Sequence, residues 1–198
     1  MKRRLAILAA LAFTVLGLAP LSAQNTTVRH LNGPASLKAR FNAFADRPRL
    51  VLFIGPTCAA CANGARYVDE YILKRYPNFN MKVMCVWMPL FDSDNYQESL
   101  NTSARFTDSR FEHLWDTRMD IALWLYQNWV PKMPPTISYN REFATGFVWD
   151  AFFLYPDGVK WDALPPEPVV GNAPIVEYFS SIEQAVRGMM VGKTSGRS

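Results

Sequence analysis

The fold of this chain of 198 residues is indicated most clearly by one segment, Leu50-Val51-Leu52-Phe53-Ile54-Gly55-Pro56-Thr57-Cys58-Ala59-Ala60-Cys61. Its first five residues are uniformly apolar, which predicts a strand covered on both faces, as in the centre of an α/β sheet. A Gly-Pro turn ends the strand, and the two cysteines open a segment with apolar residues at helical spacing up to Tyr76. The pattern predicts a strand, a tight turn, a cysteine pair and a helix, in that order.

Further strands follow this unit. Pro77 should end the helix, and residues 81–88 form a second β-rich run. A strand, a crossover helix and another strand make a right-handed unit with parallel strands. Residues 148–161 hold two strand-like runs around Tyr155-Pro156-Asp157-Gly158, which predicts a β-hairpin.

The segment between these parts is less regular. Residues 91–110 are polar and predict a surface excursion with a short helix around Gln97. Residues 111–115 then predict a short strand and 116–129 an amphipathic helix. Near the C-terminus, Asn172 is expected to cap a last helix.

The N-terminus has the layout of a secretory signal peptide. Lys2, Arg3 and Arg4 precede an apolar run over 5–18 and a small-residue site that ends at Ala23. The run is shorter than the roughly 20 residues that span a bilayer, so no stable membrane span is expected after cleavage. The protein is therefore predicted to be exported, either to a periplasm or out of the cell.

The mature chain is expected to be one domain over residues 24–190, followed by a disordered tail over 191–198. Residues 1–23 carry three positive charges and no negative ones, so the formal net charge of +4 becomes +1 after their removal. Acidic and basic residues are interspersed, without the clustered basic face that nucleic acid requires. Nucleic-acid binding is therefore not expected.

Cys58 and Cys61 are the candidate catalytic residues. Two cysteines at the start of a helix can form a small disulfide ring, and the helix N-terminus favours the thiolate of the first. Cys58 would attack a disulfide and Cys61, the more buried thiol, would resolve the mixed disulfide. Such chemistry needs no cofactor.

Other uses of the pair are less favoured. A zinc site needs further ligands, and His30 and His113 have no recognisable spacing to the cysteines. A purely structural disulfide would close so short a loop that it stabilises little. No metal is therefore assigned, and Cys85, inside an apolar strand, is expected to be an inert buried thiol.

Residues 50–75 resemble the active-site unit of the thioredoxin superfamily, and 152–158 resemble the strand and turn of exported TlpA-like reductases and redoxins. The resemblance implies an α/β, thioredoxin-like fold. Its central mixed β-sheet would be flanked by helices, with an insertion between the βαβ unit and the C-terminal hairpin, within residues 91–148.

Three positions depart from the family pattern. Thr57 stands where thioredoxins have a tryptophan, and Ala59-Ala60 replaces the usual Gly-Pro. Leu52 occupies the site of the family's buried aspartate, so that proton acceptor is missing. The third departure concerns the cis-proline that faces the cysteines in the family.

Two registers are open for that facing position. The register set by the Asp157-Gly158 turn puts Trp149 and Asp150 opposite the thiols, where Asp150 would act as the base that Leu52 cannot be. The alternative register uses Pro135, in Pro135-Thr136-Ile137.

The leading functional hypothesis is an exported thiol-disulfide oxidoreductase. Its expected partners are protein disulfides or dithiols and an unidentified redox partner. Two other classes stay open: a thioredoxin-fold protein that carries copper(I) on the same thiols, and an interaction module without catalysis.

Overall fold

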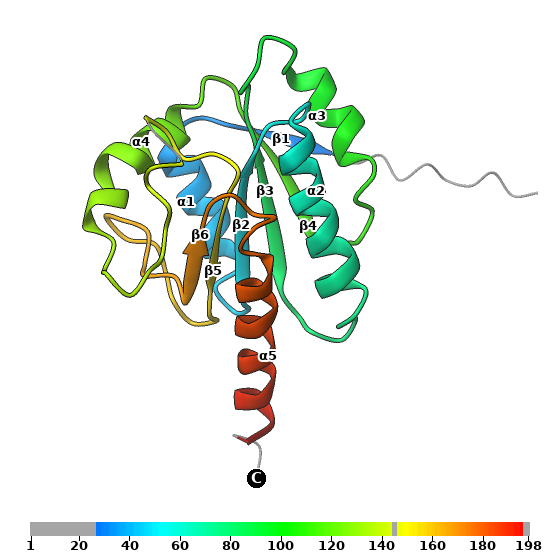
Figure 1. Ribbon diagram of the computed structural model, residues 1–198, viewed down its shortest axis with the longest axis vertical. Coiled ribbons are helices and arrows are strands. Elements are labelled where there is room, and N and C mark those ends of the chain that lie inside the picture. The colour runs from blue at the N-terminus through cyan, green and yellow to red at the C-terminus, as the bar shows by residue number, and fades with distance from the viewer. Residues whose placement is uncertain (1–26, 144–145, 196–198) are drawn as a thin grey trace, which may run out of the picture.

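A six-stranded mixed β-sheet forms the centre of the protein in a computed structural model that describes residues 27–143 and 146–195 (Figure 1). The strands are β1 (Val28–Leu31), β2 (Arg49–Ile54), β3 (Lys82–Trp87), β4 (Phe111–Asp116), β5 (Ala151–Tyr155) and β6 (Val170–Asn172). Their order across the sheet is β1-β4-β3-β2-β5-β6. The first four run parallel, and β5 is antiparallel to both of its neighbours.

Helices cover both faces of the sheet (Figure 1). The helical elements are α1 (Pro34–Ala43), α2 (Ala59–Tyr67), the π-helix η1 (Val68–Leu73) that continues α2, α3 (Tyr96–Ser103), α4 (Asp120–Asn128), the 3-10 helix η2 (Val130–Lys132) and α5 (Phe179–Ser195). Residues of α2, η1 and α5 belong to the core on one face, and residues of α1 and α4 belong to the core on the other.

The apolar run from Leu50 to Ile54 lies in β2, the strand with a parallel neighbour on one side and an antiparallel one on the other. Side chains of a strand alternate between faces. Leu50, Leu52 and Ile54 accordingly lie in the core beneath α2, whereas Val51 and Phe53 lie in the core beneath α1 and α4. Because both faces are covered, every residue of β2 is buried, as the sequence predicted.

The fold is the thioredoxin-like α/β arrangement that the sequence predicted. β2, α2 and β3 form the βαβ unit, and the C-terminal strands β5 and β6 extend the sheet beyond β2. The chain between β3 and β5 contributes α3, β4, α4 and η2. Its strand β4 covers the predicted segment 111–115 and inserts between β1 and β3.

The second strand of the C-terminal hairpin was placed wrongly. β5 pairs with β6, through Phe153 opposite Gly171, and residues 159–161 are not a strand. Side chains satisfy the backbone of the loop instead. The buried Arg49 donates to the carbonyls of Pro156 (2.5 Å) and Val159 (2.9 Å).

Asn42 of α1 completes this arrangement through a two-way contact with Trp161. Its amide nitrogen donates to the Trp161 carbonyl (2.9 Å), and its Oδ1 accepts from the Trp161 N–H (2.8 Å). A backbone whose polar groups are already paired with side chains has no need of a strand partner. This pairing is long-range, which is why the local sequence pattern did not indicate it.

The C-terminal region differs from the prediction at both ends. The last helix begins at Phe179 instead of just after Asn172, whose Oδ1 accepts from the N–H groups of Asn140 and Ala173. α5 then continues to Ser195, so residues 191–195 are helical where a disordered tail over 191–198 was expected.

Two further predictions concern the export signal and a membrane span. The signal peptide over residues 1–23 lies outside the described residues. Within the residues that are described, none of the helices has the length and apolarity needed to cross a membrane.

Asn42→Ala tests the side-chain pairing of the long loop. The variant loses both hydrogen bonds to Trp161 and leaves two backbone groups without their partner, so we expect it to lower the free energy of unfolding by about 1–3 kcal/mol. Chemical denaturation measures this value. Asn78→Ala, an exposed turn residue, serves as the control and should change it by less than about 0.5 kcal/mol. Equal values for the two variants would contradict the assigned role.

Candidate functional site

Cys58 and Cys61 lie where the central strand passes into α2. β2 ends at Ile54, Gly55 to Thr57 form the turn, and Cys58 is the N-cap of α2. The two Cα atoms are 5.3 Å apart and the two sulfurs are joined in a disulfide. The strand, turn, cysteine pair and helix therefore follow one another as the sequence predicted.

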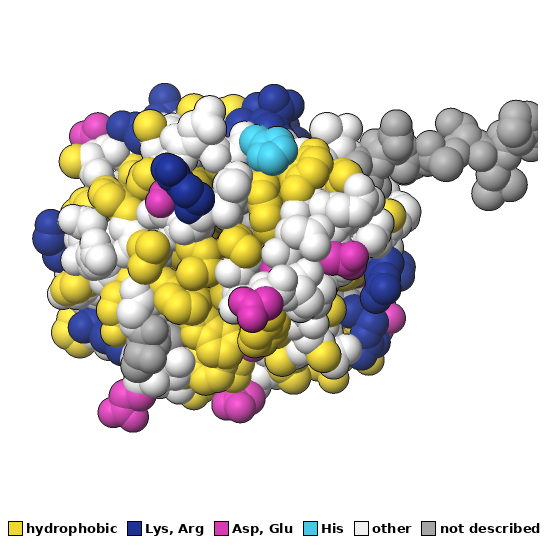
Figure 2. All heavy atoms as spheres, turned by 90° about the horizontal axis from the view of Figure 1, so that it is seen from above, with side chains coloured by type: hydrophobic (Ala, Val, Ile, Leu, Met, Phe, Trp, Pro, Cys, Tyr) yellow, Lys and Arg dark blue, Asp and Glu magenta, His cyan; other side chains and the backbone are white. Residues whose placement is uncertain are grey.

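The two cysteines differ in their access to solvent. Cys58 is 5% exposed and Cys61 is fully buried, while Thr57, Ala59 and Ala60 around them are exposed. Cys58 thus presents the only edge of the disulfide that a partner can reach. Figure 2, which looks down on this end of the molecule, shows apolar side chains over much of the surrounding face.

Two backbone N–H groups at the start of α2 donate to Cys58, one to its sulfur and one to its carbonyl. The N–H of Cys61 donates to Cys58 Sγ at 3.2 Å, and the Ala62 N–H donates to the Cys58 carbonyl at 2.9 Å. The first turn of α2 holds no acidic residue. A thiolate at Cys58 would therefore be stabilised by an N–H donor and by the positive end of the helix dipole.

Asp94, in the loop between β3 and α3, holds the turn that carries Cys58. Its Oδ1 accepts from the N–H (2.8 Å) and the hydroxyl (2.6 Å) of Thr57. Its Oδ2 accepts from the N–H groups of Leu90 (2.9 Å) and Phe91 (3.0 Å) in its own loop. One buried carboxylate thus joins the cysteine turn to the loop beside it.

Two further contacts fix the same turn. The Thr102 hydroxyl of α3 donates to the carbonyl of Pro56 at 3.0 Å, in a buried position. A Cβ at Gly55 would lie 2.9 Å from Asp94 Oδ2 and 2.8 Å from a methyl carbon of Leu90, so only glycine allows the loop to approach so closely.

Sequence reasoning missed Asp94. The polar segment 91–110 predicts a surface excursion with a short helix around Gln97; α3 confirms that helix, but Asp94 just before it is buried. One signal was available: the carboxyl ends of parallel strands meet at one edge of a sheet, so the residues after β3 lie beside those after β2.

Asp150 directly precedes β5 at the same edge of the sheet. Ala151 pairs with Phe53, which brings Asp150 beside Ile54, the last residue of β2. Phe152 and Leu154 face α2, whereas Asp150 has a φ of 41° and does not continue the alternation of the strand; its proximity to Ile175 relates it to that face. The structure therefore follows the register in which Trp149 and Asp150, rather than Pro135, precede the strand that pairs with β2.

The carboxyl of Asp150 is close to α2 by a second criterion. The backbone N–H of Ile175 lies near enough to lower the pKa of this carboxyl, and a Cβ at Gly64 of α2 would lie 2.8 Å from Ile175 Cβ. Ile175 belongs to the same core cluster as Cys58 and Cys61. Ile175 thus lies between Asp150 and α2, the helix that carries the cysteine pair.

Asp150 is 1% exposed, and its Oδ1 has no hydrogen-bond partner among the described residues. Burial raises the pKa of this carboxyl to about 6, although the Ile175 N–H lowers it and Glu177 adds a smaller upward effect. A carboxyl with this pKa can both accept and return a proton near neutral pH.

The other predicted residues take no part in this arrangement. Trp149 packs toward the opposite core and stacks on Phe143 with ring centroids 4.7 Å apart, and Pro135 is exposed in the loop after η2. Leu52 is buried and apolar, as the sequence implied. Cys85 is a buried free thiol in β3, and burial raises its pKa far above the usual range.

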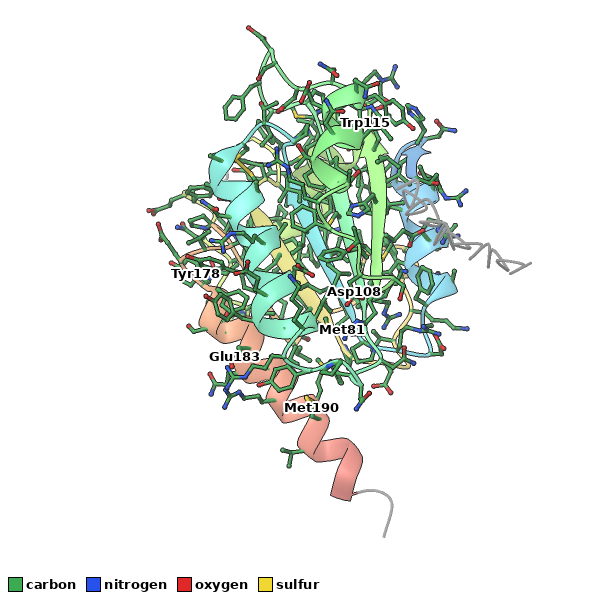
Figure 3. All side chains as sticks on the ribbon, turned by 90° about the vertical axis from the view of Figure 1, so that its right-hand side faces the viewer. Met81, Asp108, Trp115, Tyr178, Glu183 and Met190 are labelled. Atoms are coloured by element: carbon green, nitrogen blue, oxygen red, sulfur yellow. A yellow bond between two sulfur atoms is a disulfide. The ribbon has the colours of Figure 1, made fainter. Side chains whose placement is uncertain are left out.

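A cavity of about 260 Å³ lies away from the pair, near the starts of β3 and β4, where Arg40, Lys82 and Asp108 are among its lining residues. In Figure 3, Asp108 marks this lower end of the sheet and Trp115 the upper end. The part of the chain that is described holds no group of three or more His, Cys, Asp or Glu placed to bind a metal ion.

The comparisons with known proteins are sparse. Neither the protein-family models nor the curated proteins give a match. Among solved structures, the chain is similar to the solution structure of a candidate thioredoxin from Neisseria meningitidis, with 16% identity, a TM-score of 0.39, and coverage of 74% of this chain and 79% of that one. The fold assignment rests on the strand order and pairing above.

Asp150→Asn tests the burial of this carboxyl through stability. Because the pKa of Asp150 is raised in the folded state, to about 6 from 3.8, the wild-type protein loses stability relative to the variant as pH rises from about 4 to 6. The shift corresponds to a loss of up to about 3 kcal/mol, complete above pH 7. Denaturation of both proteins at pH 4 and pH 7.5 measures it, and a difference independent of pH would show that Asp150 titrates normally.

Proposed function

We propose that this protein is an exported thiol-disulfide oxidoreductase that acts on protein disulfides through Cys58 and Cys61. The observation that carries the proposal is the joined cysteine pair at the start of α2, with only the Cys58 edge open to solvent. A disulfide that closes so short a loop contributes little to stability, so its chemistry is the better reason for its presence.

In the reduced protein, the Cys58 thiolate attacks one sulfur of the substrate disulfide. The substrate S–S bond breaks, and Cys58 becomes bonded to the sulfur that it attacked. The other substrate sulfur leaves and takes up a proton. Cys61 then loses its proton and attacks Cys58 Sγ, which releases the attached substrate sulfur as a thiol. The substrate gains two electrons and two protons, and the protein ends in the Cys58–Cys61 disulfide. A redox partner of the dithiol class returns the electrons.

Asp150 is the proton acceptor for Cys61 in this scheme. Cys61 is fully buried and needs a base to become a nucleophile. The carboxyl of Asp150 faces the same core, has one oxygen without a described partner, and has a pKa of about 6. It occupies the role that Leu52 cannot fill, from the neighbouring strand instead of from β2.

The substrate class is supported by the surface around the pair. Phe91 is 52% exposed, and its N–H is fixed on the same Asp94 that holds Thr57. Figure 2 shows apolar side chains over the middle of this face, with a few charged side chains among them. An apolar surface beside a nucleophile favours contact with a polypeptide over a small charged disulfide.

Export is supported by the sequence of the first 23 residues. A charged start, a short apolar run and a small-residue cleavage site are typical of secretory signals. A protein that exchanges disulfides is of use in an oxidising compartment, where cysteines of other exported proteins pair.

Single-cysteine variants test the proposed function. Cys58→Ser should abolish reduction of a disulfide-bonded protein such as insulin, because the nucleophile is missing, whereas Cys61→Ser should accumulate a mixed disulfide that gel electrophoresis without reductant detects. Cys85→Ala, which removes the buried free thiol, is the matched control and should keep full turnover.

Thiol trapping in glutathione buffers gives the second measurement. A reversible two-electron couple that both single-cysteine variants lose supports the proposal. Absence of turnover with any disulfide, together with tight binding of added copper(I) by both thiols, would overturn it in favour of a metal carrier. Absence of both activities would leave an interaction module and overturn it as well.

A further inference from the structure

We propose that Asp94 is a positioning residue whose charge opposes the Cys58 thiolate and so biases the cysteine pair toward giving electrons, that is, toward reduction of substrates. The inference rests on the proposed function and assigns it a direction. It starts from the contact between the Asp94 carboxylate and Thr57, the residue before the nucleophile.

The contact is close and well ordered. Asp94 is 7% exposed, and both of its oxygens accept hydrogen bonds, from Thr57 on one side and from Leu90 and Phe91 on the other. The exposed Ser93 hydroxyl lies 2.7 Å from the Thr57 hydroxyl and closes the arrangement toward solvent. These contacts hold the carboxylate on the turn, so its distance from Cys58 is fixed.

The charge of Asp94 is not offset by a cation. All four donors are neutral N–H or O–H groups, and no ion pair within the described residues involves Asp94. The first turn of α2 carries no acidic residue, and the other buried carboxyls at this edge belong to Asp150, before β5, and to Asp116, the last residue of β4. Asp94 is therefore the negative charge attached to the turn itself.

This charge lies close enough to Cys58 to matter. Thr57 directly precedes Cys58 in the chain, so the carboxylate on the Thr57 N–H and the Cys58 sulfur lie within about 10 Å, one Debye length at 0.1 M salt. A nearby negative charge disfavours a second one. The helix dipole and the Cys61 N–H stabilise the thiolate, and Asp94 acts against them.

The consequence is a direction for electron flow. A pair whose reduced, thiolate form is strongly stabilised is an oxidant, because that stabilisation draws electrons to it. Asp94 reduces the stabilisation of the thiolate and shifts the equilibrium toward the protein disulfide. The substrate disulfide is then the species that becomes reduced.

Asp94→Asn removes the charge with little change of shape. In the reduced protein, we expect Cys58 to react with iodoacetamide at pH 6 about 3- to 10-fold faster than in the wild type, and the equilibrium with glutathione to shift toward the dithiol by a similar factor. Tandem mass spectrometry of the peptide that contains both cysteines locates the label on Cys58.

Thr57→Val is the matched structural control. It keeps the Asp94 carboxylate and the Thr57 N–H but loses the hydroxyl that donates to Asp94, so it loosens the turn without removing the charge. Its alkylation rate at pH 6 should stay within about twofold of the wild type or fall. Equal acceleration in Thr57→Val and Asp94→Asn, or no acceleration in Asp94→Asn, would overturn the inference.

Ser93→Lys gives a test that leaves Asp94 and its four bonds in place. Ser93 is exposed beside Thr57, so a lysine there brings a positive charge near the carboxylate, and Ser93→Gln is the neutral control. We expect faster alkylation in Ser93→Lys only, with the difference reduced at 1 M salt. Equal alkylation rates in the two Ser93 variants would overturn the inference. This test does not depend on whether Asp94→Asn folds.

The failure of this inference is distinct from that of the proposed function. If the wild-type protein shows no reversible couple with glutathione, the proposed function itself is wrong. If the couple exists and none of the charge variants moves it, the oxidoreductase stands and Asp94 only supports the turn.

Discussion

The structure depends on the covering of β2 on both faces. α2 and α5 cover one face of this strand, and α1 and α4 cover the other, so the chain reaches the surface only beyond the ends of the strand. The turn to Cys58 follows its carboxyl end. Because each residue of β2 is buried, the position of that turn is set by the whole core rather than by the turn alone. The cysteine pair therefore begins α2 at a fixed place, with one edge toward solvent.

Two buried carboxylates lie beside the start of α2, and they differ in how many hydrogen bonds they accept. Asp94 accepts four hydrogen bonds and serves as a clamp between two loops. Asp150 has an oxygen without a described partner, and burial raises its pKa. A fully satisfied carboxylate gives rigidity and a fixed field, whereas a poorly satisfied one gives or takes a proton readily. In the proposed function, Asp94 fixes the position of the cysteine turn and Asp150 accepts the proton of Cys61.

The elements that were predicted correctly are those whose signals are local. The uniform apolarity of Leu50 to Ile54 indicated a doubly covered strand, and the run 111–115 indicated β4. The hairpin was predicted wrongly beyond Gly158 because Asn42 and Arg49, more than 100 residues earlier in the chain, take up the backbone groups of the loop. No local pattern around residues 159–161 carries that information.

The sequence by itself determined the class of fold and the two cysteines, because both follow from spacing along a few consecutive residues. It also suggested Asp150, with Trp149 and Pro135, as one of three candidates for the position facing the thiols. Only the tertiary structure decided between the registers, through the pairing of Ala151 with Phe53, and only it revealed Asp94. The physical reason is that pairing between strands and hydrogen bonds between loops depend on which chain ends meet at one edge of the sheet, and strand order is a property of the whole core.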